Sequence, residues 1–394
     1  MRRRLLRPLA CVIALVAMGT ACAHRIRSDD GRLRATAAAL VHEIGADTLW
    51  ITLHRPGYAS GTTRIPIRAD SLAALVSAYR RELGVDARAP SPAAADSAHA
   101  AAVEAAHRGN VAEARMAAVL LPPELRARLP ESGEIVVVPA GPLWAVPFAA
   151  LPLGEEEPMG IRFALRYAES PEDERESASD VRDDASALRA ALVVGNPRMP
   201  VETMADRAPL VPLPAAEREA AWVAARLGAV ALTGAGADEA TVRARLPHAP
   251  LAHLATHGVS EAEGGTSFLA LAPGGGEDGR LTVEEVRRLP ALRAELVVLS
   301  ACETGMEEGT EDGGAPPLQR AFRARGARSV LASLWRVSDE AAEPLMRAFY
   351  AHWLDDADRP SKAEALRRAQ ADLRRAPGFA DPLYWAAFQL HGGR

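Results

Sequence analysis

The stretch ELVVLSAC, residues 295–302, decides the fold class. It is a short apolar run without the polar–apolar alternation of a sheet that has one solvated face. This pattern is typical of a parallel strand covered by helices on both sides. The run ends in Cys302, one of 3 cysteines in a chain of 394 residues. In α/β proteins, functional groups collect where such strands end.

Runs of the same kind recur along the second half of the chain and alternate with segments of helical spacing. The expected strands are 191–197, 229–234, 251–258, 295–302, 327–335 and 384–390, and the expected helices are 215–228, 238–247, 281–289, 316–326, 338–355 and 361–375. Asp238 is placed as an N-cap, and Thr282 with Glu285 has the spacing of a capping box. The alternation predicts an α/β fold with a doubly wound, mainly parallel sheet and helices on both faces.

The first third of the chain has a different organisation. Residues 48–54 and 62–67 are typical of two strands in a hairpin-like pair, and residues 71–83 have helical spacing. We therefore predict a smaller N-terminal α/β lobe over residues 45–130. The main domain is expected to occupy residues 131–394.

Residues 1–23 have the pattern of an export signal. A cluster of arginines precedes the apolar run LACVIALVAMGTACA, which is short for a membrane span. Three interpretations stay open: cleavage at the A-x-A site Ala21-Cys22-Ala23, a lipoprotein signal with the lipid on Cys22, or an uncleaved anchor. We expect an exported protein of the cell envelope or periplasm, with residues 24–44 as a tether. The only membrane contact that we predict for the mature protein is a lipid anchor at Cys22.

The cysteine count and the net charge limit the chemistry. Cys11 and Cys22 belong to the signal, so Cys302 has no partner for an internal disulfide. The net charge of −5 gives no basis for a nucleic-acid partner. The glycine-rich stretches do not match a phosphate-binding loop, and we expect no metal or organic cofactor.

A candidate catalytic dyad stands at the ends of two expected strands. His257 follows the run LAHLAT, and Cys302 ends the run ELVVLSAC. If these strands are neighbours, the imidazole can accept the thiol proton and later protonate a leaving amine. The backbone N–H groups of Gly258 and Cys302 can then form an oxyanion hole. A structural interpretation stays open, because a lone cysteine is often only a small apolar residue.

Three residues beside the dyad have other expected roles. His253 precedes His257 by four positions, and we expect it to hold a backbone carbonyl or the dyad, since a metal site needs more ligands. Thr256 is expected to form a local hydrogen bond. Ser300 is a weaker alternative nucleophile.

The pairing of LAHLATHG (251–258) with VVLSACETG (297–305) resembles the CHAT family of caspase-like cysteine peptidases, which share a fold with caspases, separases and gingipains. Further segments look like successive blocks of this family, namely 136–151, 192–197, 213–247, 328–342 and 382–392. The resemblance runs from about residue 130 to the end of the chain. It implies that His257 and Cys302 are the catalytic pair. The tandem helical repeats that CHAT proteins often carry are not visible.

The resemblance implies a cysteine endopeptidase that hydrolyses peptide bonds through a thioester on Cys302 and is regulated by a partner or by loop ordering. The expected partners are a protein or peptide substrate and an activating protein. The alternative is a non-catalytic caspase-like scaffold that binds a partner at the cell envelope.

Two acidic segments have no assigned chemistry. The loop ETGMEEGTEDGGAPP after Cys302 is either a solvated loop or a source of negative charge near a substrate pocket. In the second interpretation Glu303 and Asp339 favour Arg or Lys before the scissile bond. Residues 169–184 are almost all charged or small, so we expect a solvated insertion.

Overall fold

The computed structural model describes residues 37–85, 111–154, 157–170, 180–199, 210–259, 267–301, 315–355 and 357–393. For Asp339 it describes the backbone alone. In these residues, no helix combines the length and the apolar character that a membrane crossing requires.

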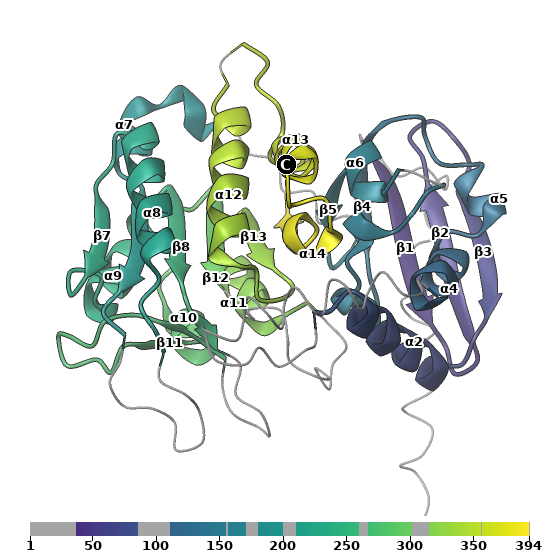
Figure 1. Ribbon diagram of the computed structural model, residues 1–394, viewed down its shortest axis with the longest axis horizontal. Helices are drawn as coiled ribbons and strands as arrows, with labels where there is room; N and C mark the ends of the chain where they lie inside the picture. The colour runs from purple at the N-terminus through teal and green to yellow at the C-terminus, as the bar shows by residue number, and fades with distance from the viewer. Residues whose placement is uncertain are drawn as a thin grey trace, which may run out of the picture.

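A single large sheet organises the described chain. Its strands are β1 (Ala38–Ile44), β2 (Thr48–His54), β3 (Gly61–Pro66), β4 (Gly133–Val138), β5 (Phe163–Tyr167), β6 (Leu192–Pro197), β7 (Ala231–Gly234), β8 (Leu251–Thr256), β12 (Leu296–Ala301), β13 (Ser329–Ser333) and β14 (Phe388–Gly392). The 11 strands lie in the order β3-β2-β1-β4-β5-β14-β13-β12-β8-β6-β7. Figure 1 shows β7 and β3 at opposite ends of the molecule.

The sheet is mainly parallel, as predicted. Within it, antiparallel pairing is confined to β1–β2, β2–β3 and β13–β14. The other neighbours are parallel. The antiparallel β13–β14 pair therefore separates a first block (β7, β6, β8, β12, β13) from a second block (β14, β5, β4, β1) that runs in the opposite direction. The carboxyl ends of the two blocks consequently face opposite edges of the sheet.

Helices cover both faces of the first block. Over the described chain as a whole, the longer helices are α2 (Ala69–Glu82), α4 (Val111–Leu120), α8 (Pro214–Leu227), α11 (Pro317–Ala324), α12 (Asp339–Trp353) and α13 (Lys362–Arg375). The shorter ones are α5 (Pro123–Arg126), α6 (Met159–Arg162), α7 (Ala185–Arg189), α9 (Glu239–Arg245), α10 (Val283–Arg288) and α14 (Pro382–Trp385). Successive residues of β12 enter different clusters, since Val298 packs with the cluster that includes α8 and α12, and Val297 with the cluster that includes α10 and α11. This alternation confirms the doubly wound arrangement.

A small second sheet adjoins the end of β8. It consists of β9 (Gly258–Val259), β10 (Phe268–Ala270) and β11 (Arg280–Thr282), in the order β11-β10-β9. All of its strand pairs are antiparallel. Because β9 starts one residue after His257, this sheet fixes the chain on the far side of the candidate histidine.

Two expectations need correction, and one strand was missed. Residues 38–44, assigned to the end of the tether, form β1 and pair with β2 and β4. The strand β5 was not predicted, and the segment expected as a strand over 384–390 is the short helix α14 followed by β14.

The two predicted helix caps are confirmed. The side chains of Asp238, Thr282 and Glu285 each accept the backbone N–H that their motif requires.

The acidic insertion is anchored at its end. Residues 171–179 lie outside the described residues, but Asp180 pairs with Arg182 and with Arg359 at 3.0 Å. Arg182 also donates to the carbonyl of Trp353 at 2.8 Å. The end of this segment is therefore attached to the helical layer, while the solvated insertion expected over the residues before it stays a prediction.

The first three strands join the same sheet as the main domain. β1 pairs in parallel with β4, so the N-terminal strands extend the second block. The predicted boundaries of the lobe (45–130) and of the main domain (131–394) stay predictions.

Candidate functional site

The strands that lead to the two dyad residues are neighbours. β8 and β12 pair in parallel, and Thr256 lies opposite Ala301 in the register. His257 follows Thr256, and Cys302 follows Ala301 in the sequence. Cys302 and Glu303 lie outside the described residues. The structure thus meets the condition of adjacent strands, while the dyad itself stays a prediction.

His257 is held in a defined orientation. The residue is 6% exposed, and its Nε2 lies 2.8 Å from the carbonyl oxygen of Val211. A carbonyl oxygen can only accept, so Nε2 carries the proton. In the neutral ring Nδ1 is then the unprotonated nitrogen, which can act as a base.

The surroundings of His257 favour the neutral imidazole. Burial lowers the pKa of His257 below its usual value of 6.5; the hydrogen bond to Val211 opposes this shift, and the nearby Arg336 charge adds to it. The ring is therefore mostly unprotonated at neutral pH, as a general base requires. Sequence reasoning missed Val211, which acts through its backbone carbonyl, and Arg336, which follows β13.

The backbone N–H of Gly258 does not bond to the neighbouring strand β10. Gly258 lies opposite Leu269, and the flanking Ala270 N–H donates to the His257 carbonyl at 2.8 Å. Bonded and non-bonded pairs alternate in an antiparallel ladder, so Gly258 and Leu269 form a non-bonded pair. The Gly258 N–H is thus directed away from β10, which suits a donor to an external oxygen.

Hydrogen bonds fix the last residues of both strands. The Ser333 hydroxyl donates to the carbonyl of Ala301 at 2.7 Å. Thr256 donates to the carbonyl of Ala270 at 2.5 Å, a contact across 14 residues and not the local bond that we expected. Ser300 lines a cavity of about 20 Å³ together with Thr256, Ala301 and Ser333, which is room for about one water molecule.

Glu219, which lines this cavity, belongs to a buried polar group with His253. His253 Nε2 is 3.0 Å from Glu219 Oε1, without the alignment of a hydrogen bond, so the contact is electrostatic. On its other side, His253 Nδ1 is 3.2 Å from the Tyr350 hydroxyl. Burial and the Glu219 charge raise the pKa of Tyr350 well above 10, so this hydroxyl stays protonated and can donate. Within the described residues, His253 therefore contacts side chains of α8 and α12, where we expected a backbone carbonyl or the dyad; Cys302 lies outside these residues.

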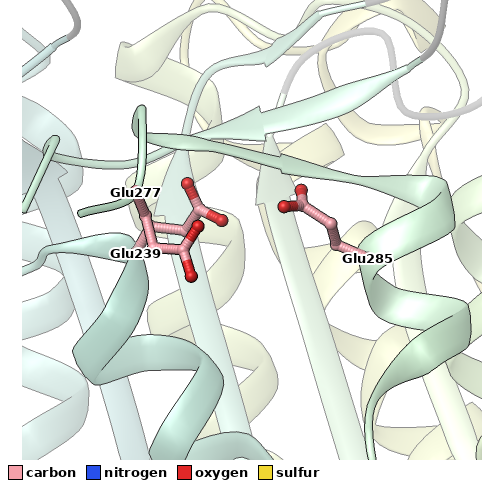
Figure 2. A group of neighbouring side chains, drawn as sticks. All are labelled: Glu239, Glu277 and Glu285. Carbon is pink, nitrogen blue, oxygen red and sulfur yellow. The ribbon is translucent and has the colours of Figure 1, made fainter. Parts of the chain in front are cut away.

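Three carboxylates gather at the small sheet, as Figure 2 shows. Glu239, Glu277 and Glu285 bring oxygens within 4.8 Å of one another. Nη1 of Arg243 contacts them at 3.3, 2.8 and 3.2 Å respectively. Burial and the neighbouring Glu285 raise the pKa of Glu239 to about 7, although it accepts the Gly279 N–H. Arg243 supplies the countercharge, so the cluster is an ion-pair network that joins α9 to α10.

The predicted substrate pocket stays a prediction. Asp339 opens α12, but its side chain, like Glu303, is outside the described part of the structure. The charge that the structure does place beside His257 is the positive one of Arg336.

Comparison with known proteins identifies the family. The CHAT domain model matches residues 112–393, well over half of the chain. This chain therefore belongs to the CHAT domain family, which confirms the resemblance in the sequence. The match begins at Ala112 in α4, which lies inside the predicted N-terminal lobe.

Two curated relatives and two solved structures are similar to parts of the chain. Tetratricopeptide repeat protein 28 of Homo sapiens is 28% identical over 298 residues, and that of Mus musculus is 30% identical over 303 residues. Each match covers 66% of this chain and only 12% of the relative. The Arg-specific cysteine proteinase gingipain R has a TM-score of 0.44 at 10% identity, covering 82% of this chain and 74% of its own. The separase–securin complex of Saccharomyces cerevisiae has a TM-score of 0.48 at 10% identity, covering 91% of this chain and 30% of the other.

Proposed function

We propose that this chain is a cysteine peptidase that hydrolyses peptide bonds with His257 and Cys302. The observation that carries the proposal is the state of His257. Its buried ring is held by the Val211 carbonyl, with Nδ1 unprotonated, at the end of the strand next to the one that leads into Cys302.

The reaction follows from these groups. His257 Nδ1 accepts the Cys302 thiol proton, and the sulfur attacks the carbonyl carbon of the peptide. The N–H groups of Gly258 and Cys302 stabilise the oxyanion, and loss of one such donor typically costs about 100- to 1000-fold in rate. The C–N bond then breaks as His257 protonates the leaving amine. Water, deprotonated by His257, hydrolyses the thioester and restores the thiol.

Substrate, control and location are further parts of the proposal. A carboxylate of Glu303 or Asp339 in the substrate pocket favours a basic residue before the scissile bond, whereas Arg336 near His257 favours an acidic one.

We infer an activating protein partner, and export to the cell envelope with a lipid anchor at Cys22.

A thiol-directed peptide probe, combined with basic, acidic and neutral fluorogenic peptides, tests the activity. We expect labelling and turnover in the wild type, loss of both in Cys302→Ala, and a fall of at least about 100-fold in turnover in His257→Ala. His248→Ala removes an exposed histidine and should leave both signals unchanged. Absence of labelling under reducing conditions, with and without cell extract as a source of activator, favours the scaffold alternative. Equal turnover of the three peptides contradicts a charged substrate pocket.

A further inference from the structure

A larger cavity lies where strands of the second block end. Its volume is about 610 Å³, within the range of small-molecule sites. Tyr167 ends β5, His391 lies at the end of β14, and Trp144 follows β4; all three line it. In open α/β sheets ligands bind in crevices outside the carboxyl ends of the parallel strands. The cavity is thus separate from the strand ends that carry His257.

One face of α11 forms the opposite wall. Leu318 and Phe322 of this helix are in the hydrophobic core. Gln319, Arg320 and Arg323 line the cavity instead. The helix therefore divides into an apolar face toward the sheet and a polar, cationic face toward the cavity.

The floor is a layer of flat rings. His391 stacks on Trp144 with centroids 5.8 Å apart and on Tyr167 with centroids 5.6 Å apart. Burial and the Arg323 charge lower the pKa of His391 to about 3, so its ring is neutral at neutral pH. The layer offers an uncharged aromatic surface to a ligand.

The described lining carries more positive than negative charge. Arg320 and Arg323 face the cavity, against the single carboxylate of Glu169. Arg323 is positioned by donation to the carbonyl of Ala327 at 2.9 Å and to that of Arg328. A guanidinium held in this way beside a neutral floor favours an anionic group.

We propose that this cavity binds a small organic anion in which a carboxylate or phosphate is joined to a flat ring. The anionic group would meet Arg320 and Arg323, and the ring would lie toward Trp144. A nucleoside monophosphate and an aromatic carboxylate share this chemistry. The site is independent of peptide hydrolysis, so its test does not depend on the proposed function.

Calorimetric titration of the full chain carrying Cys302→Ala tests the site. The probes are AMP and indole-3-acetate, with inorganic phosphate and adenosine as the separate halves of the first probe. We expect at least one ring-bearing anion to bind with a Kd of about 1 mM or tighter, and more tightly than phosphate or adenosine. Binding of AMP alone assigns a nucleotide, and binding of indole-3-acetate alone assigns an aromatic carboxylate.

The variant Arg320→Gln distinguishes this site from others. It should raise the Kd of the probe that binds about tenfold or more, while its circular dichroism spectrum matches that of the parent. Arg293→Gln removes an exposed arginine outside the cavity and should have no effect. Equal affinity in Arg320→Gln and its parent, or no binding of either ring-bearing anion at about 1 mM, overturns the proposal.

Discussion

At the scale of single residues, the sequence indicates which histidine matters but not which of its nitrogens. His257 is marked by its place after an apolar strand and before Gly258. Its tautomer depends on the carbonyl of Val211, which is 46 positions away. Every residue has a carbonyl, so no sequence pattern distinguishes this partner. The same limit applies to Gly258, whose N–H points away from β10 because of its register with Leu269.

The state of His257 can be measured directly. Because Nε2 donates to Val211, nitrogen-15 NMR of histidine-labelled protein should show the Nε2–H tautomer at neutral pH. The measured pKa should lie below 6.5, since burial disfavours the charged ring. Val211→Ala keeps the carbonyl and should preserve the tautomer. A protonated Nδ1 in the neutral form, or a pKa above 6.5, would contradict the assigned role of general base.

At the scale of elements, the regular alternation of apolar runs and helical segments could be predicted, and the charged or alanine-rich strands could not. β5 contains Arg166, which interrupts its apolar run and weakens the strand signal. In the fold this side chain is buried and pairs with Glu134 at 3.0 Å while donating to the Gly392 carbonyl at 3.0 Å. β1 begins with alanines, which have little strand preference, and it is stabilised by pairing with two neighbours.

A buried pair fixes α8 against β8 and hence the approach to His257. Glu219 is 2% exposed and faces His253 at 3.0 Å. Glu219→Ala should lower the free energy of unfolding by about 2 to 3 kcal/mol, because the buried His253 ring loses the carboxylate beside its Nε2. Urea denaturation measures this change. Glu217→Ala, on the exposed side of the same helix, removes only an exposed hydrogen bond from Asn196; it is the control and should cost about 1 kcal/mol or less. Similar losses in the two variants would argue against a specific role for the buried pair.

At the scale of the whole molecule, the sequence predicts the sheet type but not its strand order. β12, β13 and β14 pair in sequence order, but β14 also pairs in parallel with β5, an early strand, where His391 lies opposite Tyr167. Such pairings are set by long-range packing and leave no local signal. For the same reason the cavity at the second block, built from segments around Trp144, Tyr167, α11 and β14, was not predicted.

The continuous sheet predicts that the N-terminal strands unfold together with the rest. Hydrogen exchange measured at increasing urea should give β2 and β12 the same limiting free energy of opening, since hydrogen-bonded neighbours connect them. If β1, β2 and β3 instead open together at a distinctly lower free energy, the predicted lobe over 45–130 is a separate folding unit. Mass spectrometry of peptides from the two strands makes this comparison.

The reversal of strand direction between β13 and β14 has a consequence for how this molecule can diversify. A sheet of one direction has one margin where loops follow strand ends, and every new binding surface must compete for it. Here β13 is 5 residues long, so the two loop-bearing margins are roughly 15 Å apart. Insertions at one margin need not obstruct the other, so a single sheet can carry two recognition surfaces that acquire new specificities separately.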